Sequence, residues 1–197
     1  MAKKYYAVKK GRKKGVFTSW ADTQKVISGY SNAEFKSFAT LEEAKNYLDN
    51  TPQTIDTRDP ELLCAYVDGS FDKATKRYSY GVVLIKNNKI LTTIANSDNH
   101  SDYADSFQIA GECFGALNAI KWAINHDYDR IVIFYDYLGI EMWAKGNWRA
   151  NKPVSKDYVA HFKKFSAKIK VDFVKVKAHS GIEYNELADQ LAKDALK

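Results

Sequence analysis

Two aspartates of this sequence stand directly after apolar runs. Asp136 follows the run 131–135, and Asp68 follows the run 62–67. Taken singly, each has an ordinary structural explanation, Asp136 as the N-cap of a helix and Asp68 as a turn residue. If both runs are neighbouring parallel strands, however, the two carboxylates emerge at the same end of a sheet. Open α/β sheets commonly bind ligands at that end.

A third acid, Glu112, lies within the apolar stripe of a helix that we expect over 106–126. It stands three residues after Ile109 and four before Ala116, so the helical period places it on the apolar side. A glutamate on a helix usually faces solvent, but this spacing argues against that arrangement. A buried carboxylate needs a partner, because uncompensated charge in apolar surroundings is costly. A divalent cation is one such partner.

The C-terminal part of the chain contributes a fourth acid and a histidine. Asp189 shares a helical face with Asn185, at the edge of the apolar side of a helix expected over 182–196. His179 lies in a Gly-containing loop after a strand expected over 171–177. On their own, both are most simply interpreted as surface residues.

Clustered carboxylates with few other candidate ligands suit hard cations such as Mg²⁺ or Mn²⁺. Two such ions about 4 Å apart can activate water and stabilise the leaving oxygen at a phosphodiester. Other catalytic classes have no comparable support. Neither Cys64 nor Cys113 is followed by a plausible base motif, no Gly-x-Ser-x-Gly occurs, and the basic turn 11–15 lacks the spacing of a Walker loop.

These residues need a framework, and the hydrophobic pattern divides the chain into two modules. The polar, proline-containing stretch 49–61 is expected to be a linker. Residues 1–48 before it predict a small α+β domain with three strands and two helices. Residues 62–197 after it predict three strands, then helices alternating with two further strands. This order favours an α/β fold with a mixed sheet flanked by helices.

The boundaries expected from the pattern can be stated by residue range. In the first module the strands are 5–10, 15–20 and 34–38, and the helices are 22–29 and 40–48. In the second module the strands are 62–67, a hairpin over 78–95 that turns at 87–88, 131–135 and 171–177. The helices there are 106–126, 138–145, 155–168 and 182–196.

Charge and composition narrow the classes of partner. The net charge is +6 at pH 7, and residues 1–50 hold ten Lys/Arg against five Asp/Glu. This excess at the front indicates a polyanionic partner.

No apolar run approaches the roughly 18 to 20 residues that cross a bilayer, and no apolar signal region begins the sequence, so no membrane association is expected. Cys64 and Cys113 lie inside apolar patterns, as expected of buried free thiols in a reducing cytoplasm. Nothing in the sequence indicates an oligomeric state.

The chain resembles the bacterial type 1 ribonuclease H family. The matching segments are YVDGS at 66–70, AGE at 110–112, the strand before Asp136, and HSGIEYNELADQLA at 179–192. The last segment is the most specific, and the order and spacing of all four make chance agreement improbable. The resemblance implies a ribonuclease H-like five-stranded sheet of order 3-2-1-4-5. It also implies endonucleolytic hydrolysis of RNA paired to DNA, which leaves 5′-phosphate and 3′-hydroxyl ends.

The resemblance also implies a role for each acid. Asp68 would bridge two metal ions, two Mg²⁺ with Mn²⁺ as an alternative. Glu112 and Asp136 would each help to hold one ion, and Asp189 would complete the site. His179 would assist in proton handling or in product release.

The chain departs from the family pattern near the expected nucleic-acid contacts. Gly69, Ser70 and Gln108 are the candidates there, but residues 71–81 replace a Gly/Pro-rich turn and Gln108 stands where familiar members have asparagine. The stretch 136–153 is too short for the basic protruding helix of some members. Tyr137 occupies a position at which many relatives have a small hydroxyl residue.

The first module resembles the hybrid-binding domain, related to viroplasmin-type domains, that precedes some members of the family. The matching segments are YYAVKKGRKKGVFTSW and FKSFATLEEA. By this match Tyr6, Trp20 and Phe35 are candidates for packing on sugar and backbone, and Arg12 and Lys36 for contacting phosphates. The aromatic residues could instead fill a small core. RNA/DNA hybrid is the expected ligand, double-stranded RNA is a second candidate, and tethering would raise the substrate concentration at the second module.

Three functional classes fit these observations. The first is an active hybrid-specific ribonuclease, the second a nucleic-acid-binding protein with a decayed catalytic domain, and the third another nuclease of the same fold, such as a resolvase or transposase-like enzyme. The presence of all four acids favours the first, since decay usually removes at least one. The segment from His179 to Asp189 and the first module argue against the third.

Overall fold

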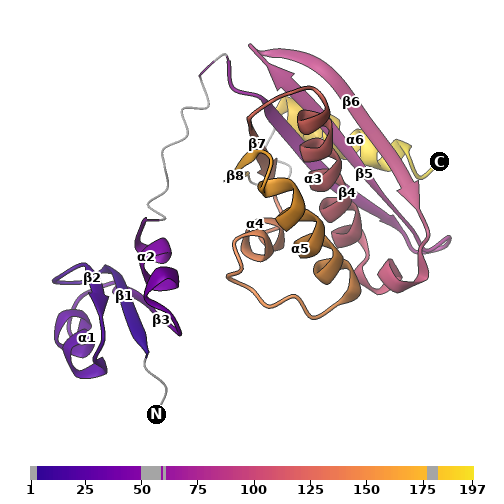
Figure 1. Cartoon of the computed structure of the whole chain (residues 1–197). Coiled ribbons are helices and arrows are strands. Elements are labelled where there is room, and N and C mark those ends of the chain that lie inside the picture. The colour runs from indigo at the N-terminus through magenta and orange to yellow at the C-terminus, as the bar shows by residue number, and fades with distance from the viewer. Residues whose placement is uncertain (1–3, 50–58, 60, 177–181) are drawn as a thin grey trace. The chain divides into compact units, whose positions relative to one another are not determined.

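The computed structural model describes residues 4–49, 59, 61–176 and 182–197 (Figure 1). The chain forms two compact units, Met1–Asp56, the front unit, and Thr57–Lys197, the main unit. Each unit has its own sheet and its own buried side chains.

The front unit is a small antiparallel sheet with two helices, and the predicted three-stranded α+β architecture is confirmed. Strand β1 lies between β2 and β3. The core is correspondingly small, with Ala7, Val8, Thr23 and Ala44 fully buried. The elements are β1 (Tyr5–Lys10), β2 (Gly15–Phe17), α1 (Trp20–Ile27), β3 (Glu34–Phe38) and α2 (Leu41–Asp49).

The main unit has a mixed sheet of five strands in the order β6-β5-β4-β7-β8. Strands β4, β5 and β6 pair antiparallel, whereas β4, β7 and β8 pair parallel. Counted within the unit, this is the predicted order 3-2-1-4-5, which is confirmed. Asn87 and Asn88 form the predicted hairpin turn with φ of 52° and 57°, a conformation that Asn tolerates. The strands are β4 (Cys64–Asp72), β5 (Arg77–Lys86), β6 (Lys89–Asp98), β7 (Arg130–Tyr135) and β8 (Lys170–Lys175).

Helices cover both faces of this sheet (Figure 1): α3, α4 and α5 lie on one face and α6 on the other. The longest helix, α3, buries its apolar side against β4 and β5, as its period predicts. In the described part of the chain, no helix is both long enough and apolar enough to span a bilayer. The helices are the short 3-10 helix η1 (Ser101–Ser106), α3 (Gln108–Asn125), α4 (Gly139–Ala144), α5 (Pro153–Ser166) and α6 (Glu183–Asp194).

One boundary differs from the prediction in a way that affects the site. The first strand of the main unit is predicted over 62–67, with a turn as one interpretation of Asp68, but β4 continues to Asp72. The continuation is held by pairing with β5, in which Asp68 lies opposite Gly81 and Asp72 opposite Arg77. The turn interpretation of Asp68 is therefore wrong, and this carboxylate projects from a rigid strand.

Candidate active site

The carboxylates of Asp68, Glu112 and Asp136 converge, although they lie far apart in the sequence. Each offers an oxygen atom, and these atoms lie within 4.8 Å of one another. The sheet register explains the meeting of the two aspartates. The parallel pairing of β4 and β7 ends at Tyr66 opposite Phe134, and Asp68 and Asp136 each lie two positions further on.

Glu112 reaches this cluster because α3 packs unusually close to β4 at Gly69. A Cβ atom at Gly69 would lie 2.3 Å from the carbonyl oxygen of Gln108 and 2.6 Å from the backbone nitrogen of Glu112. Only glycine permits this approach. The Gly69 N–H also donates a hydrogen bond to Oδ1 of Asp68 over 2.7 Å, which fixes that carboxylate.

The converging carboxylates need a positively charged partner. Glu112 is only 3% exposed, and its Oε2 atom is buried without a hydrogen-bond partner among the described residues. Burial raises the pKa of Glu112 well above its usual value, and the neighbouring carboxylates of Asp136 and Asp68 raise it further. Three carboxylates with an unpaired buried oxygen are the donor set that a hard divalent cation satisfies, so the residues present fit Mg²⁺ or Mn²⁺.

Asp136 does not cap the helix that follows it. The N-cap position of α4 is Leu138, with no side-chain capping bond. The capping interpretation of Asp136 is therefore wrong, and its carboxylate is directed to the cluster.

Asp189 lies next to the cluster rather than within the group of three. Its carboxylate forms an ion pair with Lys193 one helical turn later, at 2.5 Å. This hydrogen bond raises the pKa of Lys193, and the charge of Asp68 contributes to the shift. Asp189 and Lys193 also share a hollow of about 460 Å³ with Gly69 and Ser70. We call it the α6 hollow.

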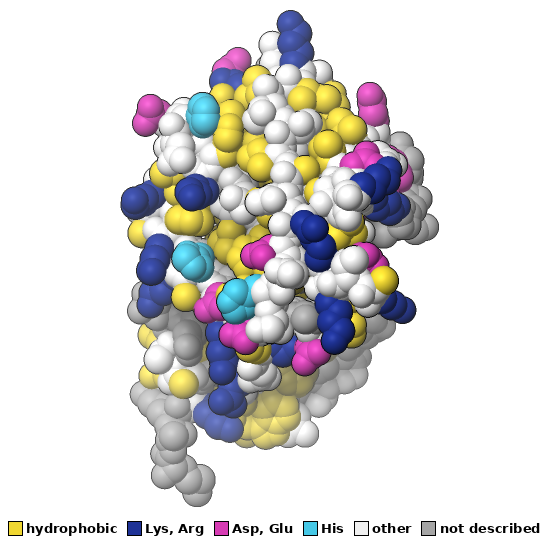
Figure 2. Space-filling view, turned by 90° about the vertical axis from the view of Figure 1, so that its right-hand side faces the viewer, with side chains coloured by type: hydrophobic (Ala, Val, Ile, Leu, Met, Phe, Trp, Pro, Cys, Tyr) yellow, Lys and Arg dark blue, Asp and Glu magenta, His cyan; other side chains and the backbone are white. Residues whose placement is uncertain are grey.

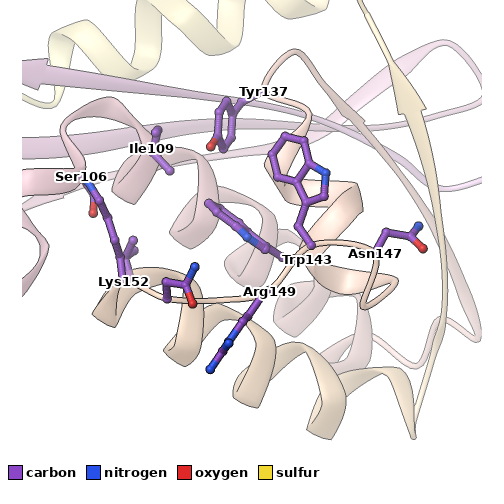
Figure 3. Close-up of a pocket in the computed structure, with 10 residues that line it drawn as sticks. Ser106, Ile109, Tyr137, Trp143, Asn147, Arg149 and Lys152 are labelled. Carbon is purple, nitrogen blue, oxygen red and sulfur yellow. The ribbon is translucent and has the colours of Figure 1, made fainter. Parts of the chain in front are cut away.

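A second hollow, of about 650 Å³, lies beside Tyr137 and is called the α4 hollow. Figure 3 shows Ile109, Tyr137 and Trp143 turned toward the same space, with Arg149 and Lys152 at its edge. The rings of Tyr137 and Trp143 pack at 5.7 Å between centroids. A tyrosine phenol is protonated at neutral pH and can donate a hydrogen bond, and burial raises the pKa of Tyr137 further. The space therefore combines aromatic surface with cationic groups.

The start of α3 separates the two hollows. Phe107 and Gln108 line the α6 hollow, whereas Ser106 and Ile109 line the α4 hollow. All three predicted nucleic-acid contacts of the main unit, Gly69, Ser70 and Gln108, thus lie together beside Asp189.

Positively charged side chains are interspersed with acidic ones on one face of the molecule, and they also line both hollows. Figure 2 shows one face of the molecule, on which Lys and Arg side chains are interspersed with Asp and Glu. That face carries no continuous basic patch. The cations that line the hollows are candidates for contacts to an anionic ligand: Lys73 and Lys193 in the α6 hollow, and Arg149 and Lys152 in the α4 hollow.

In the front unit, Tyr6, Trp20 and Phe35 form one aromatic cluster. The ring centroids of Trp20 lie 5.5 Å from Tyr6 and 5.8 Å from Phe35. Trp20 is 45% exposed and Phe35 is 40% exposed, so these two rings do not fill the core. They form an apolar surface that is open to a ligand.

The two cations predicted for the front unit lie apart from this cluster. The Arg12 guanidinium lies beside Gly29. Lys36 is exposed, and its ammonium group lies 5.7 Å from the centroid of the Phe38 ring. Lys36 and Phe35 alternate along β3 and so face opposite sides of the strand. Both cations are available for phosphates, but Lys36 does not share a face with Phe35.

His179 lies outside the described residues. Lys193, Phe107 and Trp143 were not among the predicted site residues, although the four-residue spacing of Asp189 and Lys193 on a helix is a signal for an ion pair.

Comparison with known protein families matches both units. The model described as "Ribonuclease H1 N-terminal domain" matches residues 4–48, and the RNase H model matches residues 60–197. The ribonuclease H of Caldanaerobacter subterraneus is 39% identical over 141 residues, which cover 70% of this chain and 92% of that protein.

Two other relatives match this chain over very different lengths. Ribonuclease H1 of Mus musculus is 20% identical over 260 residues, covering 98% of this chain and 89% of that protein. The ribonuclease H of Crithidia fasciculata is 38% identical over 52 residues, which are 26% of this chain and only 10% of that protein.

Solved structures share the fold of the main unit. RNase H1 from Halobacterium salinarum superposes with a TM-score of 0.58 at 20% identity and covers 68% of this chain and 97% of that one. LC11-RNase H1, solved in complex with RNA/DNA hybrid, gives a TM-score of 0.56 at 15% identity and covers 68% of this chain and 99% of that one.

Proposed function

Because this chain belongs to the ribonuclease H family of enzymes, we propose that it hydrolyses the RNA strand of RNA/DNA hybrids as an endonuclease. The observation that carries the proposal is the convergence of Asp68, Glu112 and Asp136 around a buried, unpartnered oxygen of Glu112. The products would be 5′-phosphate and 3′-hydroxyl ends.

The four acids would hold two Mg²⁺ ions, with Mn²⁺ as an alternative. Asp68 would bridge the ions, Glu112 and Asp136 would each help to hold one, and Asp189 would complete the set. When bound, the ions activate water and stabilise the leaving oxygen of a phosphodiester. The protein's part is to fix the carboxylates before substrate arrives, through the rigid strand at Asp68 and the burial of Glu112. His179 would assist in proton handling or product release.

The two hollows support a duplex substrate. They lie on either side of the start of α3, and each combines aromatic surface with cationic side chains. Such a combination suits sugars and phosphates better than a small apolar ligand. Gly69, Ser70 and Gln108 would contact the nucleic acid beside Asp189. The complex of LC11-RNase H1 with RNA/DNA hybrid supports the same class of ligand here.

The front unit would bind the hybrid and hold it near the main unit. Its exposed rings, Trp20 and Phe35, would pack on sugar and backbone together with Tyr6. Arg12 and Lys36 would contact phosphates, a salt-sensitive attraction that does not depend on sequence. Double-stranded RNA is a second proposed ligand of this unit. We place the protein in the cytoplasm, since the thiols of Cys64 and Cys113 are free and buried.

A cleavage assay with a defined set of substrates tests the proposal. The purified full chain should cut the RNA strand of a labelled hybrid with Mg²⁺ or Mn²⁺, leave duplex DNA intact, and be inactive in EDTA. End analysis should find 5′-phosphate on the RNA fragments. Binding of hybrid without cleavage in either metal would contradict the proposal and favour a nucleic-acid-binding protein instead.

A further inference from the structure

We propose that Phe107 is a substrate-contacting residue whose ring packs against a sugar of the bound nucleic acid. The inference deepens the proposed function and rests on it, since it names a contact at the same site. Phe107 stands immediately before α3, in the α6 hollow that also holds Asp189 and Lys193.

The ring of Phe107 is exposed but firmly backed. The residue is 50% exposed, more than any other large hydrophobic residue in the described part of the chain. Its ring meets that of Phe71 edge-on, at 5.2 Å between centroids and 81° between planes. Phe71 is itself partly buried and packs on the core. Phe107 therefore has one side supported by the protein and another side free for a ligand.

The backbone of Phe107 is an unfavourable place for a bulky residue. Its φ is 50° and its ψ is −136°, a conformation that glycine adopts freely and that L side chains rarely adopt. The conformation is imposed by its neighbours, because Phe107 accepts the first hydrogen bond of α3 from the N–H of Ala110 and the next residue, Gln108, packs on Gly69. A ring that is half exposed gains little free energy from burial, so burial does not offset the cost of this backbone conformation. Stability therefore does not explain a phenylalanine here, whereas a ligand contact does.

The surroundings of the ring specify the chemistry of the ligand. Lys73 and Lys193 line the same hollow and suit phosphate groups, while the ring of Phe107 adds an apolar surface to that hollow. In a duplex the bases are paired and stacked on one another, so the apolar surface open to such a ring is the sugar. A sugar flanked by phosphates is the unit that these groups match together.

The test uses three substitutions and a matched control in the full chain. Phe107→Ala and Phe107→Gly remove the ring, Phe107→Tyr retains it, and Leu91→Ala truncates an equally exposed apolar residue on β6 that lies in neither hollow. Phe107→Ala and Phe107→Gly should raise KM for a labelled hybrid several-fold, because the apolar contact of one ring with a sugar is lost. Their kcat should stay within about twofold, because a ground-state contact is lost. Phe107→Tyr and Leu91→Ala should behave like the wild type.

The thermal stability of Phe107→Gly distinguishes a ligand contact of Phe107 from a purely structural role. Because glycine adopts this backbone without strain, Phe107→Gly should melt at or above the wild-type Tm despite its weaker substrate binding. A lower Tm for Phe107→Gly together with an unchanged KM would overturn the inference, since the ring would then serve only the fold. Equal KM values for wild type and Phe107→Ala would overturn it as well.

A measurement of binding tests the Phe107 contact independently of whether the protein cleaves hybrid. Affinity for hybrid is measured by fluorescence anisotropy in EDTA, where no cleavage is needed, both in the wild-type background and in a Trp20→Ala background. Absence of cleavage by the wild type would contradict the proposed function. In that case a weaker affinity for Phe107→Ala would still support the contact, and an unchanged affinity would overturn it.

Discussion

Replacing Glu112 by glutamine should stabilise the cation-free protein and remove its response to a divalent cation. Burial and the charges of Asp136 and Asp68 raise the pKa of Glu112 well above its usual 4.5, so the folded state binds this proton more tightly than the unfolded chain does. The resulting stability is present below the unfolded pKa and is lost as the pH rises toward the folded pKa. At pH 8 the buried carboxyl group of Glu112 therefore lowers the stability of the folded wild type, whereas the neutral amide of the glutamine variant does not.

The size of the effect follows from the unpartnered Oε2 atom of Glu112. A buried polar group without a partner costs about 1–3 kcal/mol, and a charged one costs more. Glutamine has nearly the same shape without the charge, so a gain of about 1–3 kcal/mol is expected at pH 8. For a unit of this size that gain corresponds to roughly 3–9 °C in Tm. At pH 5 the gain should be smaller, because more of the wild-type carboxyl group is protonated.

The assay is thermal unfolding of the full chain, followed through the transition of the main unit, in EDTA and in Mg²⁺. A cation present at a hundred times its Kd should stabilise the wild type by about 2.7 kcal/mol and the Glu112→Gln variant far less. Glu141→Gln is the matched control, because this carboxylate accepts a hydrogen bond from Tyr135 and pairs with Lys145 outside the cluster. It should keep the cation response and show no gain in Tm. A lower Tm for Glu112→Gln in EDTA at pH 8, or an unchanged Mg²⁺ response, would refute the reasoning.

Three further predictions concern the front unit, the sheet and the fourth acid. Trp20→Ala should weaken hybrid binding several-fold while kcat at saturating substrate stays constant; Tyr30→Ala, an equally exposed ring outside the cluster, should bind normally in the same anisotropy assay. Gly81→Ala should destabilise the main unit by about 3 kcal/mol in urea unfolding, because the new Cβ would lie 2.1 Å from a carbonyl oxygen of α6; a loss below about 1 kcal/mol would mean that α6 can shift. Lys193→Met should lower the Mg²⁺ concentration at half-maximal activity about twofold, since an i,i+4 pair contributes about 0.3–0.5 kcal/mol and Asp189 would no longer be held by it; an unchanged midpoint would show that the ion pair does not compete with the cation.

The sequence was sufficient for the features that depend on local periodicity. The helical period alone places Glu112 on the apolar side of α3, and the structure buries it there. The exposed aromatic residues of the front unit, by contrast, could have been core or surface. Only the packing of Ala7, Val8 and Ala44 decides that Trp20 stays outside.

Features that depend on pairing between distant segments could not be predicted in this way. The continuation of β4 through Asp68 depends on its pairing with β5. The closeness of Asp68 and Asp136 depends on the register of β4 with β7. The conformation of Phe107 has no signal in the residue itself, because phenylalanine disfavours it and the packing of α3 on Gly69 imposes it.

The bulky ring at position 137 now has a structural explanation. Tyr137 packs on Trp143, and a Cβ at Gly139 would lie 2.2 Å from the Tyr137 ring. The glycine thus makes room for the tyrosine, and the ring lines the α4 hollow.

The most direct test of the central claim is cleavage of a labelled RNA/DNA hybrid in Mg²⁺ by the wild type and by Asp136→Asn. Asp172→Asn serves as the control, since Asp172 is paired with Arg130 on β7 and β8 outside the cluster. We predict that the wild type and Asp172→Asn cut the RNA strand and that folded Asp136→Asn is slower by at least a hundredfold. Comparable cleavage by Asp136→Asn would contradict the assignment of the three converging carboxylates as the active site.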